Sequence, residues 1–198
     1  MLSAKSSLLL LLTALGLGSI GFMPKSRVGQ PITIHLKSAD ADDVTGHFTQ
    51  TDRVQMVQLV APVINVDETG CVLHDDPAEI SNCISTLKFS DPDVPVIAVN
   101  GCIGGTPVNL GDLDNDGLDE IGLLPQWFSS CWHDYHVYTY KQGAWVPAVP
   151  PFATHCNQWE ANIQPIIKDP AQRGHVIITY SALEGTDIVF KTKSLAIR

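Results

Sequence analysis

The acidic segment 111–124 is the part of this sequence that most restricts the fold. It reads Gly-Asp-Leu-Asp-Asn-Asp-Gly-Leu-Asp-Glu-Ile-Gly-Leu-Leu, so Asp112, Asp114 and Asp116 stand at alternate positions and Gly117 follows at once. Alternate carboxylates turn toward one centre when the backbone curls, and a glycine permits the sharp turn. The apolar run that follows ends at a proline, which predicts a short buried strand. The segment therefore predicts a turn that leads into a sheet.

Carboxylates this close together repel one another unless a cation lies between them. Ca²⁺ takes about six to eight oxygen ligands and prefers carboxylates. An EF-hand needs an apolar residue at position 8 and a glutamate at position 12, where this chain has Asp119 and Leu123. We therefore expect a different type of calcium loop, whose ligands are Asp112, Asp114, Asp116, the Leu118 carbonyl, and Glu120 or Asp119.

The loop and its strand resemble the FG-GAP/VCBS repeat, the calcium loop of integrin α-subunit propellers and of many secreted bacterial proteins. That family has Asp-x-Asp/Asn-x-Asp-Gly-x-x-Asp followed by a hydrophobic strand. The three aspartates and the Leu118 carbonyl match it, and Glu120 stands where the family usually has aspartate. The resemblance covers residues 111–124. It implies a propeller-type blade with bound Ca²⁺ and does not imply a catalytic activity.

A second copy of the pattern lies at 46–59, which aligns with 111–124 without a gap. Gly46 and Phe48 match Gly111 and Leu113, but Thr49 and Thr51 replace two of the aspartates and His47 replaces the first. We interpret it as a degenerate copy that does not hold Ca²⁺. A weaker third match, 168–180, again places a polar turn before an apolar strand.

Short β-type segments at roughly ten-residue spacing predict an all-β fold. Two or three blade-like units do not close a propeller of about four to eight blades. We expect blade-like antiparallel sheets in an incomplete β-propeller or a small β-sandwich, stapled by disulfides, in a single domain over 24–198. Hairpin turns are expected at Lys141–Ala144 and around Gly185, and one or two helical turns within Pro77–Leu87.

The N-terminus has the pattern of a targeting signal. Lys5 precedes an apolar run from Leu8 to Leu17, and small residues follow. We therefore predict that 1–23 is a signal peptide of a secreted or periplasmic protein. The alternative is a retained anchor that faces the domain away from the cytoplasm. The net charge of −9 argues against binding to nucleic acid or to anionic membranes.

Five cysteines without a Cys-x-x-Cys pair fit an oxidising compartment better than a redox motif or a zinc ribbon. We predict the disulfides Cys71–Cys83 and Cys131–Cys156, which leave Cys102 free. Other pairings of the five are compatible with the spacing. A zinc site that uses Cys131, Cys156 and neighbouring histidines is the alternative use of these thiols.

The four tryptophans fall between 127 and 159 beside several tyrosines, and we expect them to pack in the core and across the hairpin. An aromatic platform for a glycan is the alternative. We expect a calcium-stabilised binding module whose partner is a protein or a glycan. The rival hypothesis is an exported hydrolase with residues on separate loops, for example the carboxylates of Asp75, Asp76 and Glu79.

Overall fold

The computed structural model of the protein describes residues 33–34, 44–65, 71, 83–127 and 130–198. All of them belong to one compact unit, Pro31–Arg198. Among them α1 (Cys156–Glu160) is the single helix, and every other regular element is a β-strand. The predicted all-β fold is therefore confirmed. The predicted signal peptide or anchor, 1–23, lies outside the described residues.

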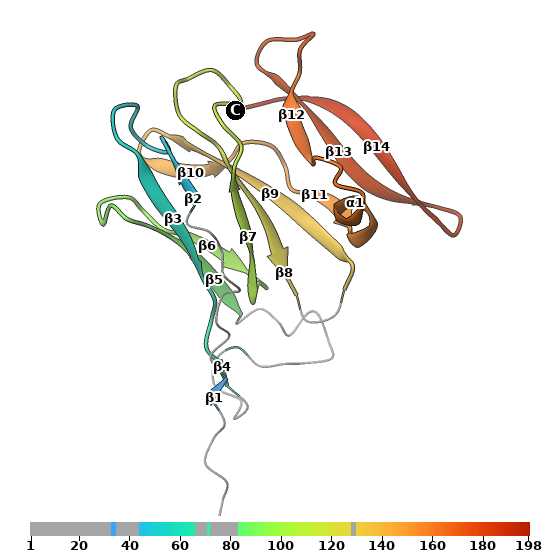
Figure 1. Ribbon diagram of the computed structural model, residues 1–198, viewed down its shortest axis with the longest axis horizontal. Coiled ribbons are helices and arrows are strands. Elements are labelled where there is room, and N and C mark those ends of the chain that lie inside the picture. The colour runs from blue at the N-terminus through green and yellow to red at the C-terminus, as the bar shows by residue number, and fades with distance from the viewer. Residues whose placement is uncertain (1–32, 35–43, 66–70, 72–82, 128–129) are drawn as a thin grey trace, which may run out of the picture. The chain divides into compact units, whose positions relative to one another are not determined.

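The strands form antiparallel sheets in which neighbours in sequence are mostly neighbours in space (Figure 1). Sheet one contains β2 (Val44–Gly46), β3 (Gln55–Val60), β5 (Ile84–Phe89) and β6 (Ile97–Asn100). Sheet two contains β7 (Gly104–Asn109), β8 (Ile121–Gln126), β9 (Trp132–Lys141), β10 (Ala144–Pro147) and β11 (Phe152–His155). Sheet three contains β12 (Ile166–Lys168), β13 (His175–Glu184) and β14 (Asp187–Ala196). A separate pair joins β1 (Thr33–Ile34) to β4 (Ile64–Asn65).

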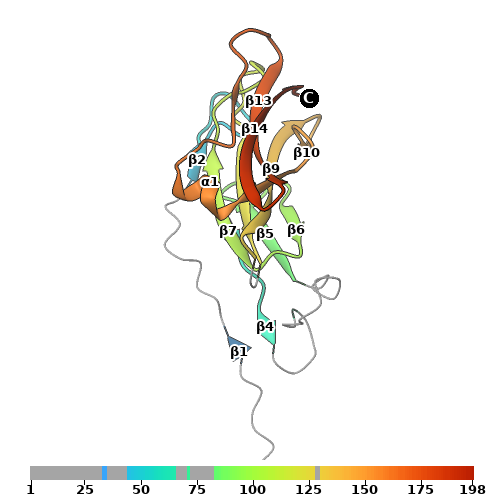
Figure 2. The ribbon, with the colours of Figure 1, turned by 90° about the vertical axis from the view of Figure 1, so that its right-hand side faces the viewer.

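Each of the three larger sheets begins as a meander, which matches the predicted blade-like arrangement. Sheet one runs β2-β3-β5-β6, sheet two runs β7-β8-β9-β10, and sheet three runs β12-β13-β14. Figure 2 shows β13 and β14 as a long curved hairpin. β11 departs from the meander because it pairs with the first half of β9, while β10 pairs with the second half.

The predicted hairpin turns are present. Lys141 pairs with Ala144, and the two residues between them, Gln142 and Gly143, both have positive φ. Two such residues in a two-residue loop match the twist of the flanking strands. Trp145 lies opposite Tyr140, as the expected packing across this hairpin requires. The helical turns expected within Pro77–Leu87 are wrong for Ile84–Leu87, which lies in β5; the segment 72–82 is outside the described residues.

Two apolar clusters hold the sheets together. The first joins sheet one to sheet two through Phe48, Val57, Leu87, Ile121 and Leu123, which are all almost fully buried. The second joins sheet two to sheet three, and its buried members are Leu113, Tyr135, Val137, Ala148, Val149, Phe152, Ile166, Val176 and Ile178. In β8 the alternate residues Ile121 and Leu123 enter the first cluster, as the pleat of a strand requires. The apolar segment after the acidic loop is therefore the buried strand that the sequence predicted.

Gly122 in β8 has no room for a side chain. A Cβ there would lie 2.1 Å from the Tyr135 hydroxyl and 2.9 Å from Val108 Cγ2. Tyr135 is only 2% exposed and packs against Phe152 and Trp159, so its ring is held on several sides. The absence of a side chain at Gly122 is what lets this ring lie across the sheet.

We expect Gly122→Ala to destabilise the protein by about 2 kcal/mol, because overpacking a filled core forces neighbouring side chains out of their rotamers. In a protein of this size that is a fall in Tm of roughly 4–8 °C, measured by thermal unfolding. Tyr135→Phe in the same chain should recover part of the loss. Gly104→Ala is the control, since its Cβ would meet only the flexible end of Gln126 at 3.1 Å. Equal losses in the two single variants would contradict this account.

Candidate metal site

The acidic loop connects β7 to β8 and is curled as predicted. The carboxylates of Asp112, Asp114 and Asp116 each place an oxygen within 4.8 Å of the other two. Asp112 holds the curl, because its Oδ1 accepts the Asn115 N–H at 2.6 Å and its Oδ2 accepts the Gly117 N–H at 3.0 Å. Asn115 and Gly117 have φ of 66° and 92°, in the left-handed region. The loop therefore gathers three of the predicted ligands around one point.

Lys141 provides a positive charge inside this group. Its ammonium donates to Asp114 Oδ2 at 2.5 Å and also to Asp116 Oδ2. Partial burial opposes ionisation of Asp116, but the contacts with Lys141, the Leu118 N–H and Asp114 together outweigh it and lower the pKa of that carboxyl. The same contacts outweigh burial and raise the pKa of Lys141. Without a metal ion, Lys141 therefore balances one of the three negative charges of the loop.

Glu120 lies apart from the three converging carboxylates. It is fully buried, and its Oε2 accepts the Leu113 N–H at 2.6 Å, whereas its Oε1 has no hydrogen-bond partner. Burial raises the pKa of Glu120 to about 7, helped by the nearby charges of Asp114 and Asp116 and opposed by the Leu113 amide. The Thr139 hydroxyl also opposes it, although it lies near the carboxyl without forming a hydrogen bond to it. A carboxylate with one unpartnered buried oxygen is costly to keep ionised without a cation.

The other two candidates for the ligand shell have different positions. The Leu118 N–H donates to Asp116 Oδ1 at 2.8 Å. Leu118 is therefore held against the last of the three converging aspartates. Asp119 faces sheet one, where its Oδ2 accepts the His47 N–H at 2.8 Å and the Asn109 side-chain amide at 3.0 Å. The Asp119 N–H also donates to the His47 carbonyl. Asp119 therefore ties the acidic loop to the degenerate loop rather than joining the three carboxylates.

The degenerate copy, 46–59, occupies the equivalent place in sheet one. Gly46 pairs with Gln55 at the end of the β2–β3 hairpin, just as the Gly111 carbonyl accepts the Glu120 N–H at the end of the β7–β8 hairpin. Gln55 is 1% exposed and fills the place of Glu120. Its Oε1 accepts the Thr49 N–H at 2.9 Å and its amide donates to the Thr49 hydroxyl at 2.7 Å. The two loops therefore share a backbone arrangement, but among the described residues three carboxylates converge only in the acidic loop.

The weaker match at 168–180 also spans the turn between the first two strands of its sheet. Lys168 ends β12, and β13 begins at His175. The Asp169 N–H donates to the His175 carbonyl at 2.9 Å, and Asp169 Oδ1 accepts the Ala171 N–H. This shorter turn carries one carboxylate and gathers no group comparable to the acidic loop within the described residues.

A cavity of about 940 Å³ adjoins the acidic loop. Tyr135 and Trp159 contribute aromatic walls, and their ring centroids are 5.5 Å apart. Apolar side chains, most of them half-buried, form much of the remaining wall, and amides lie around it. The lining residues are Thr106, Val108, Asn109, Leu110, Gly111, Asp112, Leu113, Leu124, Tyr135, Trp159, Asn162, Ile163, Gln164, Pro165, Ile166, Ile167 and Lys168. Periodicity could not have found this cavity, because its walls come from separate elements.

Both predicted disulfides are present. Cys71 is bonded to Cys83 and Cys131 to Cys156, while Cys102 is a free, buried thiol that donates to the Gly104 carbonyl. Disulfides form and persist in oxidising compartments outside the cytoplasm, and two of them indicate such a compartment for this protein. The Cys131–Cys156 bond removes the two thiolates that the alternative zinc site would need.

The aromatic side chains lie mainly against other rings. Trp145 stacks on Phe89, and Trp127 stacks on His133. These ring-to-ring contacts agree with the expected packing role of the aromatic residues better than with an exposed platform for a glycan. The candidate carboxylates of a hydrolase, Asp75, Asp76 and Glu79, lie outside the described residues.

Comparisons of the chain with protein-family models, with curated proteins and with solved structures give no match. In the part of the chain that the structure describes, no helix has both the length and the apolar character needed to cross a membrane. The site therefore has to be interpreted from its own geometry.

Glu120→Gln tests the charge state of the buried carboxyl. Because the pKa of Glu120 in the folded protein is about 7 and a free glutamate has 4.5, the folded state binds this proton more tightly. Without metal, that contribution to stability is present below pH 4.5 and is lost as the pH rises through about 7. We expect Glu120→Gln, which places in sheet two the amide that Gln55 provides in sheet one, to be more stable in EGTA at pH 7.5 by about 2 kcal/mol.

The measurement is denaturant unfolding between pH 4 and pH 8 in EGTA, for the wild type and the variant. The wild type should lose stability across this range, and Glu120→Gln should lose less. Glu160→Gln, on the exposed surface of α1, is the matched control and should follow the wild type. Parallel profiles for the wild type and Glu120→Gln would show that Glu120 titrates normally.

Proposed function

We propose that this protein is an exported, Ca²⁺-stabilised β-domain of the FG-GAP/VCBS type that acts as a binding module. The observation that carries the proposal is the convergence of Asp112, Asp114 and Asp116 in the loop between the first two strands of sheet two. The three alternating aspartates that carry the resemblance to this repeat are also the residues whose carboxylates lie close together in the curled loop.

The residues fit a hard cation. Every side-chain donor in the group is a carboxylate oxygen, which suits Ca²⁺ and disfavours metals that prefer sulfur or nitrogen. The ion would be held by Asp112, Asp114 and Asp116, with the Leu118 carbonyl and Glu120 as the further ligands that the motif implies. The unpartnered Oε1 of Glu120 supports this, because a buried carboxylate oxygen is favourable only with a partner.

The role of the ion would be structural. Asp119 and Glu120 follow the curl immediately, and they contact His47 of the neighbouring loop and Leu113 of the second core cluster. An ion that holds the curl would therefore also hold the start of β8 in register between the two cores. Binding of this kind stabilises the folded state by mass action.

The binding activity is assigned to the cavity beside the loop. Its volume of about 940 Å³ suits a small ligand or a few sugar units better than a protein surface. The half-buried ring of Trp159 would offer a face to a sugar, and the exposed side-chain amides of Asn162 and Gln164 would contact its hydroxyls. Asp112 belongs to both the loop and the cavity lining, so calcium would order one wall of the cavity.

Export is supported by two independent features. The disulfides indicate an oxidising compartment. The N-terminal pattern of a basic residue followed by an apolar run is that of a secretory signal. Attachment to a membrane would follow only if the N-terminal segment is retained.

Thermal unfolding of the oxidised protein in EGTA and in millimolar Ca²⁺ tests the calcium site. At a Ca²⁺ concentration of about 100 times Kd, binding stabilises a protein by about 2.7 kcal/mol. For a chain of this length that is a rise in Tm of roughly 5–10 °C. We expect this rise in the wild type and its loss in Asp114→Ala, which removes one of the three converging carboxylates.

Asp52→Ala is the matched control, because Asp52 is an exposed carboxylate in the equivalent loop of sheet one. It should keep the full response to Ca²⁺. A wild type with the same Tm in EGTA and in Ca²⁺ would refute the calcium site and leave Lys141 as the counter-ion of the loop.

Lys141→Met should raise the affinity for Ca²⁺ by about tenfold. The ammonium of Lys141 contacts two of the three carboxylates that the ion needs, so a bound ion must first displace it. Calorimetric titration with Ca²⁺ measures the change, and in EGTA the variant should unfold at a lower temperature because the carboxylates lose their counter-ion.

Lys168→Met provides the control for net charge. Lys168 reaches the same loop but donates to the Asn115 side-chain carbonyl at 2.8 Å rather than to a carboxylate. Its removal should change the affinity much less. An equal gain in both variants would mean that only the overall charge matters.

A further inference from the structure

The two disulfides lie in opposite surroundings. Cys71 and Cys83 are 2% and 0% exposed and pack against Ile103 in an apolar cluster of their own. Cys131 is exposed and Cys156 is half-buried. A thiolate in solution has to approach a disulfide sulfur to attack it, so access differs sharply between the two bonds. The Cys71–Cys83 bond is shielded from exchange, and the Cys131–Cys156 bond is open to it.

The backbone holds Cys131 and Cys156 together without help from the sulfur atoms. In the β9–β11 ladder, Trp132 pairs with His155. The ladder continues one step further, where the Cys156 N–H donates to the Cys131 carbonyl at 3.0 Å. Because main-chain hydrogen bonds fix these positions, the two cysteines would stay opposite each other after reduction. A dithiol held in this way is ready to close again, so opening and closing can be reversible.

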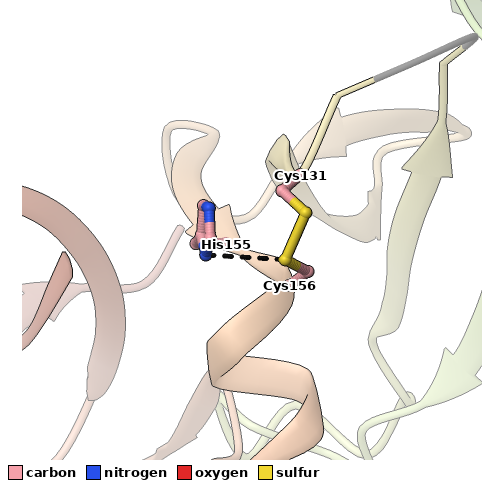
Figure 3. A group of neighbouring side chains, drawn as sticks. All are labelled: Cys131, His155 and Cys156. Carbon is pink, nitrogen blue, oxygen red and sulfur yellow. Dashed lines mark hydrogen bonds between the residues drawn. A yellow bond between two sulfur atoms is a disulfide. The ribbon is translucent and has the colours of Figure 1, made fainter.

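A histidine faces one of the two sulfurs. Nδ1 of His155 lies 3.7 Å from Sγ of Cys156, as Figure 3 shows. The same Nδ1 accepts the Asn157 N–H at 3.3 Å, so in the neutral ring the proton is on Nε2 and the lone pair of Nδ1 is directed toward this region. The edge of Trp132 lies against the ring, with centroids 4.9 Å apart, and steadies its position. His155 can therefore accept the proton of a Cys156 thiol.

We propose that Cys131–Cys156 is a thiol–disulfide exchange site whose substrate class is an external dithiol. The attacking thiolate forms a bond to Sγ of Cys131, the exposed one of the two residues. The bond between the two protein sulfurs breaks, and Cys156 leaves as a thiolate beside His155. A neighbouring imidazole stabilises a thiolate and makes it a better leaving group.

The second half of the reaction releases Cys131 and oxidises the external dithiol. The other thiolate of the dithiol attacks its own sulfur in the mixed disulfide and releases Cys131 as a thiolate. The external dithiol is oxidised to a disulfide, and the protein disulfide is reduced by two electrons. The two protons of the dithiol end on Cys131 and Cys156. His155 acts as a positioning and proton-holding residue for Cys156, and Cys131 is the sulfur that is attacked.

The first experiment compares the two disulfides in one molecule. The full chain with both disulfides formed is treated with limiting dithiothreitol, thiols are trapped at intervals with an alkylating agent, and labelled cysteines are identified by peptide mass. EDTA is included, because Cys131, His155 and Cys156 together form a group that zinc would trap once reduced. We expect labels on Cys131 and Cys156 at least about tenfold faster than on Cys71 and Cys83. Equal rates, or faster reduction of Cys71–Cys83, would overturn the proposal.

The monothiol glutathione tests the direction of attack. It should give a mixed disulfide on Cys131, because Cys131 is the exposed residue of the pair and Cys156 is the leaving group. A mixed disulfide found on Cys156 would overturn the assigned direction.

His155→Asn separates the role of the imidazole from its role at the start of α1. An asparagine side chain can still accept the Asn157 N–H, so the helix keeps its cap. We expect reduction of Cys131–Cys156 to slow by about tenfold. In glutathione redox buffers its equilibrium should also shift toward the disulfide by about tenfold, which is about 30 mV for a two-electron couple.

Two controls accompany this variant. The Cys71–Cys83 bond in the same protein should keep its wild-type rate, and His175→Asn, on β13, should leave both bonds unchanged. An unchanged rate and potential in His155→Asn would overturn the role of His155. These readouts are independent of calcium, so they stand or fall separately from the proposed function.

Discussion

The long strand β9 is the constraint on which most of this structure depends. Its middle, His136–Tyr138, pairs with β8 on one side, and on its other side the first half pairs with β11 and the second half with β10. Each pairing satisfies backbone groups that would otherwise be buried without partners. Because β9 is continuous, it also sets the places of two distant groups. Lys141 at its end reaches the acidic loop, and Cys131 just before its start faces Cys156.

The acidic loop and the degenerate loop show how one backbone frame supports two chemistries. Both connect the first two strands of a meander, and both place a buried side chain at the start of the second strand. In sheet one that side chain is Gln55, whose amide and carbonyl both find partners on Thr49. In sheet two it is Glu120, which has one partnered and one unpartnered oxygen. The loop of sheet one packs in the same backbone arrangement without the three converging aspartates. Packing therefore does not explain why the acidic loop has these carboxylates.

Several features were predictable because they depend on neighbours in sequence. The curl of the acidic loop follows from alternate aspartates and Gly117, and the β9–β10 turn follows from Gln142 and Gly143 with positive φ. Both disulfides agree with the predicted pairs, although the cysteine spacing is also compatible with other pairings. The short helix α1 was missed because its five residues are too few for a helical period to show. The helical turns expected within Pro77–Leu87 rested on the local helix-start signal at Pro77, which does not reveal that Ile84–Leu87 pairs as part of β5.

The sequence by itself determined the all-β class, the turn of the β9–β10 hairpin and the acidic group, because these depend on residues a few positions apart. Only the tertiary structure decided which partners those groups meet. Lys141 is 25 residues from Asp116, and no local pattern indicates that its ammonium enters the loop. His155 becomes a neighbour of the Cys131–Cys156 bond only because β11 folds back on β9. The cavity walls and the buried state of Glu120 arise in the same way, since burial and long-range contacts depend on how the sheets pack.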